Sequence, residues 1–262
     1  MRVISFVNLK GGVGKTLTTI NTAAILAKVH EKSVLVIDAD SQCNMTEFFK
    51  RDDLVGTCTT LADALRAAPD AGKTAMNAIY ASSFEGVDII QADDSLMALD
   101  LTSAAGLYTD CIADLVGRLK LQDVDYDFVL IDCPPAFNAA STAALLASDE
   151  VIIPIKLDAF SLRGMSNLTR QISNMREINP SLRLGGLLPT MYYKSDKIKE
   201  AEEILRKSAL PVFPHIRRTP KADDSTFAGR PLIETSPRCA AAMDYKRFAM
   251  QLLYAKGGKR NG

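Results

Sequence analysis

A glycine-rich loop lies between an apolar run and a helical pattern near the beginning of the chain. Residues 3–7 are strand-like, residues 8–16 read Asn-Leu-Lys-Gly-Gly-Val-Gly-Lys-Thr, and a helical pattern follows over 15–29. Consecutive glycines let backbone N–H groups approach phosphate oxygens, and the start of a helix adds partial positive charge there. This order of strand, loop and helix predicts an α/β fold that binds a nucleotide phosphate, and it disfavours a turn without a ligand.

The loop departs from the strict phosphate-loop pattern at its first position. Leu9 stands where that pattern has a glycine, and a second lysine, Lys10, follows it. We expect Lys15 to reach the β- and γ-phosphates and the Thr16 hydroxyl to be a ligand of Mg²⁺. A dinucleotide-binding loop is disfavoured because no third glycine follows at the required spacing. The phosphate-contacting residues expected from the loop are Gly11, Gly12, Val13, Gly14, Lys15, Thr16 and Leu17.

Short β-rich runs alternate with longer helical patterns along the whole chain. Strands are expected at 3–8, 34–38, 88–91, 128–132, 150–155, 183–190 and 212–213, and helices at 15–29, 94–118, 141–147, 162–178, 195–208 and 239–254. This alternation predicts an α/β fold of three layers, a mostly parallel twisted sheet of about seven strands with helices on both faces. We expect residues 1–262 to form a single domain with 255–262 as a flexible basic tail. Residues 51–86 carry no function that we can assign.

Aspartates end two of the apolar strands. Asp38 and Asp40 follow the run at 34–37, and Asp132 follows the run at 128–131. Ligands of parallel sheets bind at the carboxyl ends of the strands, where Asp132 suits the acid that holds Mg²⁺ directly or through water. Such aspartates could instead cap the next helix. Beside a phosphate loop, the catalytic interpretation is favoured.

Bulk composition excludes several classes of protein. The chain is 47% hydrophobic and 24% charged, as is typical of soluble globular proteins, and its apolar runs are strand-sized rather than membrane-spanning. Five scattered cysteines without a C-x-x-C pair indicate reduced thiols in the cytoplasm rather than a disulfide framework or a metal site. Because the first residues lead directly into the loop, we expect no cleaved signal peptide.

Charge is unevenly distributed although the net charge is zero. Residues 215–262 contain ten Lys or Arg and four Asp or Glu, so the rest of the chain is acidic by the same amount. A basic end indicates a surface that faces a polyanion. On charge alone, a solvated basic helix explains the pattern equally well.

The loop and the aspartate motifs together resemble the deviant Walker A ATPases of the ParA/MinD family. The resemblance is carried by Lys10–Thr16, by residues 38–46 (Asp-Ala-Asp-Ser-Gln-Cys-Asn-Met-Thr) and by 128–135 (Phe-Val-Leu-Ile-Asp-Cys-Pro-Pro), and it covers about residues 2–254. It implies a weak Mg²⁺-dependent ATPase that dimerises with ATP, with Lys10 reaching the partner's phosphates beside Lys15. It also implies that Asp40 positions the attacking water, with Asp38 and Asp132 at the metal.

The sequence departs from the family pattern at two positions, and two later segments resemble those of the family's base pocket. Leu17 stands where the family usually has a second threonine, so we expect the loss of a hydroxyl contact to the α-phosphate, although the Leu17 backbone N–H remains available. Ser41 stands where the family has a proline. Residues 186–192 and 211–217 resemble the family segments that flank adenine. The resemblance therefore implies a base pocket containing Thr190, Met191, Pro214 and Ile216. The alternative is that these are packing and turn residues.

Three branches of the family differ in what the ATPase does. A metallocluster carrier needs paired cysteines, which are lacking. A MinD-like membrane regulator ends in an amphipathic helix, but the apolar residues of 239–254 have the spacing of a core-facing helix. The start of the loop is closer to the ParA/Soj branch, so we expect no membrane partner. A MinD-like regulator, or a nucleotide switch of a conjugation, secretion or cellulose-synthesis assembly, remains the alternative.

The ParA/Soj branch implies an ATP-dependent partner on DNA. Its dimers bind DNA without sequence preference, which depends on basic side chains and weakens as salt rises. The candidate DNA-binding residues are Arg217, Arg218, Lys221, Arg230, Arg238, Lys246 and Arg247. The resemblance also implies a ParB-like centromere-binding partner and a nucleoid-associated location in the cytoplasm. No helix-turn-helix precedes the loop, so operator-specific autorepression is not expected.

Overall fold

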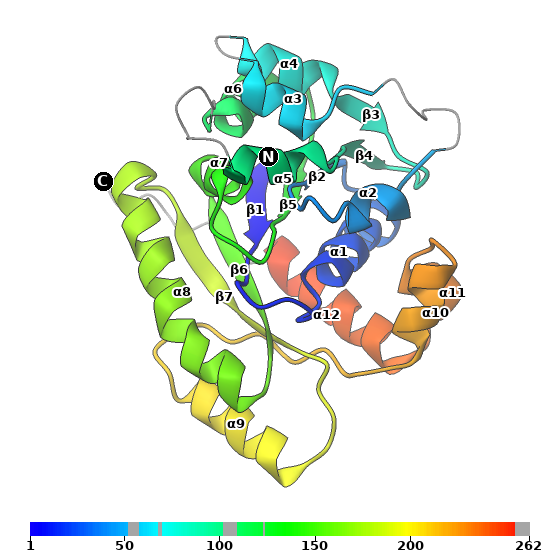
Figure 1. Cartoon of the computed structure of the whole chain (residues 1–262). Coiled ribbons are helices and arrows are strands. Elements are labelled where there is room, and N and C mark those ends of the chain that lie inside the picture. The colour runs from blue at the N-terminus through cyan, green and yellow to red at the C-terminus, as the bar shows by residue number, and fades with distance from the viewer. Residues whose placement is uncertain (52–57, 68–69, 102–108, 123, 255–262) are drawn as a thin grey trace.

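A seven-stranded sheet forms the centre of the computed structural model, which describes residues 1–51, 58–67, 70–101, 109–122 and 124–254. The strands are β1 (Arg2–Phe6), β2 (Val34–Asp38), β3 (Ile79–Ala81), β4 (Val87–Ile90), β5 (Phe128–Asp132), β6 (Glu150–Lys156) and β7 (Arg183–Thr190). Their order is β3-β4-β2-β5-β1-β6-β7, and only β3 is antiparallel to its neighbour (Figure 1). The expected tail at 255–262 lies outside the described residues.

Helices cover both faces of this sheet. One face carries α3 (Leu61–Arg66), α4 (Ala71–Asn77), α5 (Ser95–Leu101), α6 (Cys111–Leu121), α7 (Ala139–Ala147), α8 (Ala159–Ile178) and α9 (Asp196–Arg206). The other carries α1 (Lys15–His30), α2 (Asn44–Phe48), α11 (Leu232–Thr235) and α12 (Ala240–Tyr254), with α10 (Lys221–Phe227) beside α11. The predicted three-layer α/β fold is confirmed.

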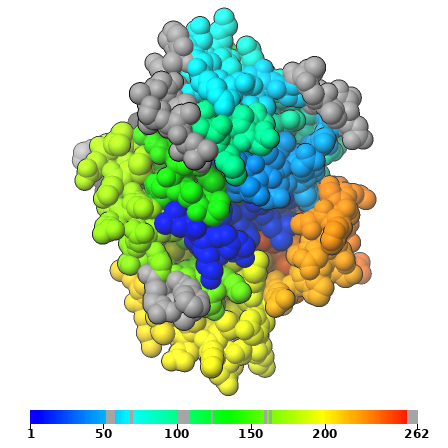
Figure 2. Space-filling view, viewed as in Figure 1, coloured from blue at the N-terminus to red at the C-terminus, as the bar shows by residue number. Residues whose placement is uncertain are grey.

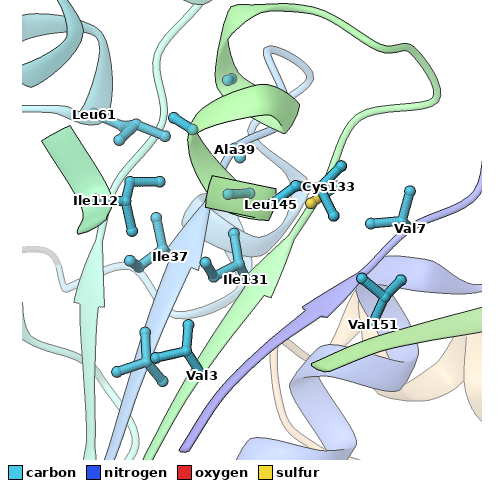
Figure 3. Packing of buried hydrophobic residues seen from close by; sticks show 14 of the residues in the cluster. Val3, Val7, Ile37, Ala39, Leu61, Ile112, Ile131, Cys133, Leu145 and Val151 are labelled. Atoms are coloured by element: carbon cyan, nitrogen blue, oxygen red, sulfur yellow. The ribbon is translucent and has the colours of Figure 1, made fainter. Parts of the chain in front are cut away.

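Successive strand residues alternate between two hydrophobic cores, because side chains of a strand point to opposite faces. Val3 belongs to the core under α3 to α9, whereas Ile4 belongs to the core under α1 and α12. Figure 3 shows Val3, Ile37 and Ile131 on the same side of the sheet as Leu145 of α7. Strands buried on both faces explain why these runs are apolar throughout.

Three element predictions need correction. The strand expected at 212–213 is reduced to an isolated bridge between Val212 and Leu187, since the flanking Pro211 and Pro214 have no N–H to extend a ladder. Strand β3 was missed because it is short and only partly buried. The helix expected at 94–118 is instead α5 and α6, and part of the connection between them lies outside the described residues.

The centre of the sheet brings the predicted motifs together. Strands β2, β5 and β1 are neighbours, and Asp132 pairs in register with both Asp38 and Phe6. The two aspartates and the loop that follows β1 therefore lie at one edge of the sheet. None of the described helices is long and apolar enough to cross a membrane.

Candidate phosphate and metal site

The loop after β1 has the backbone of an anion cradle. Gly12 and Gly14 adopt φ values of 69° and 83°, which side chains disfavour, and α1 begins directly afterwards at Lys15. The first N–H groups of α1 have no partner within the helix and no side-chain cap, so they are free for an anion. The Thr190 hydroxyl donates to the Val13 carbonyl at 2.7 Å and ties the loop to the end of β7.

The loop forms the floor of a cleft of about 900 Å³. Gly11, Gly12, Gly14, Lys15, Thr16 and Leu17 line it from the loop, with Asp40, Gln42, Asn44 and Glu47 from the segment after β2. Pro135 and Met191 contribute from the ends of β5 and β7, and residues 226–229 close it from α10 and the turn after it. The structure thus brings most of the predicted phosphate-contacting residues into one cavity.

Lys15 and Asp132 form the buried charged centre of this site. Lys15 is only 6% exposed, and burial lowers the pKa of its ammonium although Asp132 and Asp40 oppose that change. Asp132 is 1% exposed, and neither of its carboxylate oxygens has a hydrogen-bond partner of normal geometry. Burial, followed by the nearby Asp38, raises the pKa of Asp132 well above its usual value, while the Thr16 hydroxyl and Lys15 lower it.

A buried carboxylate whose oxygens have no hydrogen-bond partner of normal geometry suits a site for a cation. Oxygen ligands such as a carboxylate and a hydroxyl suit Mg²⁺, and Thr16 lines the cleft next to Asp132. The residues present therefore fit a magnesium ion held by Thr16 and Asp132.

Asp38 lies behind the cleft rather than in it. Its Oδ1 accepts from the Asp40 backbone N–H at 3.1 Å, and its Oδ2 accepts from both the N–H and the hydroxyl of Thr46 at 2.8 Å. The Thr46 hydroxyl also accepts from the Ala92 N–H after β4. Asp38 is fully buried and its oxygens accept these hydrogen bonds, so it supports the segment that carries Asp40, and its place at the metal stays a prediction.

Asp40 is placed in the cleft, as the resemblance implied. One of its carboxylate oxygens accepts from the Gln42 backbone N–H at 3.0 Å, and its backbone N–H is held by Asp38. The side chain is largely buried yet lines the cavity. It can therefore orient a water molecule beside a terminal phosphate.

Lys10 points away from this cleft. Its ammonium donates to Asp158 at 2.7 and 2.9 Å and to the Ser161 hydroxyl at 3.2 Å. Asp158 caps the start of α8 through the Ser161 N–H. Lys10 therefore contacts α8 in the single chain, and it lies outside its own phosphate cleft.

A second cavity of about 400 Å³ adjoins the phosphate cleft. Thr190, Met191 and Ile216 line it, but Pro214 does not. The segment after α9 runs beside β7, with the Ile216 N–H donating to the Pro189 carbonyl at 2.7 Å. Pro214 thus lies beside β7 itself, whereas the residues that line the cavity lie at the carboxyl end of β7 and after it. Sequence reasoning missed Tyr193, Thr219, Pro220 and Tyr245, which also line it.

Comparison with known proteins agrees with this geometry. Residues 1–184 match a family described as an AAA domain. The chain is 31% identical to the chromosome partitioning protein ParA of Caulobacter vibrioides, covering 97% of this chain and 94% of that protein. It is 30% identical to the chromosome-partitioning ATPase Soj of Treponema pallidum, with 99% of both chains covered.

The chain belongs to the ParA/MinD family of P-loop ATPases. Among solved structures, cobyrinic acid a,c-diamide synthase from Mycobacterium smegmatis, with a bound ATP analogue and magnesium, is 28% identical. It superposes with a TM-score of 0.75, covering 97% of this chain and 94% of that one. The fold is also shared with apo McdA of Cyanothece, at a TM-score of 0.79 and 23% identity, with 97% of this chain and 99% of that chain covered.

The predicted DNA-binding residues differ in whether their side chains pair with an acidic residue or line a cavity. Arg217 lines the second cavity and pairs with Asp244 at 2.7 Å, Lys221 pairs with Asp224, and Arg230 pairs with Glu234. Within the described part of the chain no ion pair involves Arg218, Arg238, Lys246 or Arg247. Arg218 also lines the second cavity, so Arg238, Lys246 and Arg247 are the predicted DNA residues that neither pair with an acid nor line either cavity in the described residues, and their contact with DNA stays a prediction.

The apolar side of the last helix is buried. Tyr245, Phe248 and Leu252 of α12 are in the core, and Leu253 packs against it. The apolar residues that would suit a membrane surface are therefore occupied by packing against α1 and the sheet.

Proposed function

We propose that this ParA/MinD family ATPase is a DNA partition protein whose Mg-ATP-bound dimer coats DNA without sequence preference. A ParB-like partner then stimulates ATP hydrolysis, which releases the dimer from the DNA. Because the ATP-bound dimer is on DNA, the protein is nucleoid-associated in the cytoplasm. The observation that carries the proposal is Lys10, a second loop lysine that lies outside its own phosphate cleft. Full-length similarity to ParA and Soj proteins supports the partition role.

Residues of the cleft have separable roles in this proposal. Lys15 and the N–H groups at the start of α1 hold the phosphates, and Thr16 and Asp132 would hold Mg²⁺. When bound, the ion neutralises charge on the phosphate oxygens. Asp40 orients the attacking water, and Lys10 of a second copy stabilises the charge that develops on the transferred phosphoryl group.

Retention on DNA is the most direct test of the proposed function. The purified chain is passed over immobilised non-specific DNA with Mg-ATP, with Mg-ADP and without nucleotide. We expect retention only with ATP, with a steep decrease as salt rises because phosphate contacts release counterions. Absence of ATP-dependent retention at low salt would contradict the DNA role and favour a nucleotide switch that acts on a protein assembly.

Catalysis is tested by substituting the cleft residues one at a time. Asp40→Ala is expected to retain ATP binding and to accumulate the ATP-bound dimer, because the water is no longer oriented. Lys15→Ala is expected to abolish nucleotide binding. Unchanged turnover in Asp40→Ala would refute the role given to Asp40.

A further inference from the structure

Phe227, the last residue of α10, is the most exposed large apolar side chain in the described part of the protein. It is 93% exposed, although burial of an aromatic ring is strongly favourable. The residue lines the phosphate cleft together with Gly12 and Lys15, which lie more than 200 positions earlier. Figure 2 shows the orange segment with α10 and α11 across a hollow from the blue N-terminal segment.

The turn that presents Phe227 is held in place by specific contacts. Ser225 is fully buried, and its hydroxyl donates to the Arg230 carbonyl at 2.6 Å. Gly229 adopts a φ of 58° that lets the chain reverse. Glu234 of α11 pairs with Arg230 and with Lys28 of α1. The turn that carries Phe227 is therefore held at a defined place relative to α1, the helix that follows the phosphate loop.

Phe227 lies in the phosphate cleft, which adjoins the second cavity, so it is close to the path that a bound nucleotide would take. Gly14, Leu17 and Met191 line both the phosphate cleft and the second cavity, so they mark the boundary between them. With phosphates on the loop and the base in the second cavity, the ribose has to cross this boundary. Leu17 and Ile20, one helical turn apart, line the cleft that Phe227 closes.

We propose that Phe227 packs against the ribose of a bound adenine nucleotide. Leu17, which lines both cavities, lies against the same part of the nucleotide, so that apolar contacts come from two elements. Binding buries the Phe227 ring that is open to water in the free chain. This inference rests on the proposed binding of Mg-ATP, and it adds a nucleotide-contact residue from the C-terminal quarter of the chain.

Calorimetric titration with Mg-ADP tests the contact. Phe227→Ala is expected to raise the Kd for Mg-ADP by about tenfold, and Phe227→Tyr by no more than about twofold because the ring is kept. Leu121→Ala, which truncates a side chain that is 87% exposed on α6, is the matched control and should leave the Kd unchanged. The melting temperature of the nucleotide-free chain should not change in Phe227→Ala, since the ring makes little contact there.

Lys15→Ala separates failure of this inference from failure of the proposed function. If Lys15→Ala abolishes Mg-ADP binding but Phe227→Ala and the wild type bind equally, the inference is wrong and nucleotide binding stands. If Phe227→Ala binds Mg-ADP normally but loses ATP-dependent dimerisation in sedimentation, the ring contacts a second copy and the inference is also overturned. If the wild type binds neither Mg-ADP nor Mg-ATP, the proposed function itself fails.

Discussion

In the proposed mechanism, the ion pair between Lys10 and Asp158 is the resting arrangement of the single chain. The ammonium of Lys10 contacts both oxygens of Asp158, whereas the proposed mechanism needs that ammonium at the phosphates of a second chain. Burial alone would raise the pKa of Asp158, but Lys10 and Ser161 outweigh it and hold the pKa at about 2. The contact therefore persists throughout the physiological range of pH.

Weakening this contact should favour the dimer. Asp158→Asn keeps an oxygen that can cap α8 but removes the charge that holds Lys10. We expect ATP-dependent dimer formation at several-fold lower protein concentration, with unchanged affinity of the single chain for ADP, measured by sedimentation and calorimetry. Asp196→Asn on α9, which is fully exposed, is the control. Dimerisation equal to wild type would contradict the resting role of the contact.

Asp38 should make stability depend on pH in a specific window. Burial raises its pKa to about 6, despite the opposing hydrogen bonds from Thr46 and Asp40. The folded chain then binds a proton between about pH 4 and pH 6 that the unfolded chain releases, so stability falls as pH rises through this window. The difference should be on the order of 1–3 kcal/mol in the metal-free chain.

Denaturant unfolding at several pH values measures this effect. Asp38→Asn cannot release the proton, so its free energy of unfolding should lose the part of the pH dependence between about pH 4 and pH 6 that Asp38 supplies. Identical pH profiles for the two proteins would show that Asp38 is not the titrating group.

At the scale of single elements, the buried Asp244 joins α12 to Arg217 in the segment that lines the second cavity. Asp244 of α12 accepts from the backbone N–H of Arg217 at 3.0 Å and from its guanidinium at 2.7 and 2.8 Å. Arg217 and Tyr245 both line the cavity. The last helix thus helps to shape the proposed base pocket.

Asp244→Ala should weaken both stability and nucleotide binding. Loss of the buried acceptor leaves the Arg217 N–H and guanidinium without their partner, which should lower the free energy of unfolding by about 1–3 kcal/mol. Asp224→Ala removes the partner of Lys221 in an exposed ion pair and should have a much smaller effect on stability. Thermal melts and ADP titration compare the two variants. Equal losses would show that burial of Asp244 is unimportant.

Most of the central elements could be predicted because their patterns are local. Strands β2, β5 and β6 consist almost entirely of buried residues, so each is a continuous apolar run in the sequence. The three-residue β3 has little burial and gave no such signal. Val212 has β-type neighbours, but the prolines at 211 and 214 limit its pairing with β7 to an isolated bridge.

At the scale of the whole molecule, basic side chains lie on helices of both faces of the sheet. The terminal helix α12, with Lys246 and Arg247, covers one face, and α4 with the exposed Lys73 covers the other. Non-specific binding to DNA needs basic side chains on the same face. The structure therefore offers a matched pair of positions for testing which face binds.

Removal of two charges from α12 should reduce DNA retention alone. Lys246→Ala with Arg247→Ala is expected to weaken ATP-dependent retention at least tenfold and to lower the slope of log affinity against log salt by about 2. ATP binding and dimerisation should be unchanged, since both side chains are outside the cleft. Lys73→Ala should not affect retention. A loss in Lys73→Ala and none in the α12 variant would place DNA on the opposite face.

The sequence by itself determined the phosphate loop, the acids at the ends of β2 and β5, and the layered fold. These features depend on consecutive residues, so the order of residue types within a short segment is enough to predict them. Only the tertiary structure decided that Lys10 contacts Asp158, that Asp38 is occupied by Thr46, and that Phe227 closes the cleft. Such contacts join residues far apart in the chain, so they depend on strand order and packing, which no local pattern encodes.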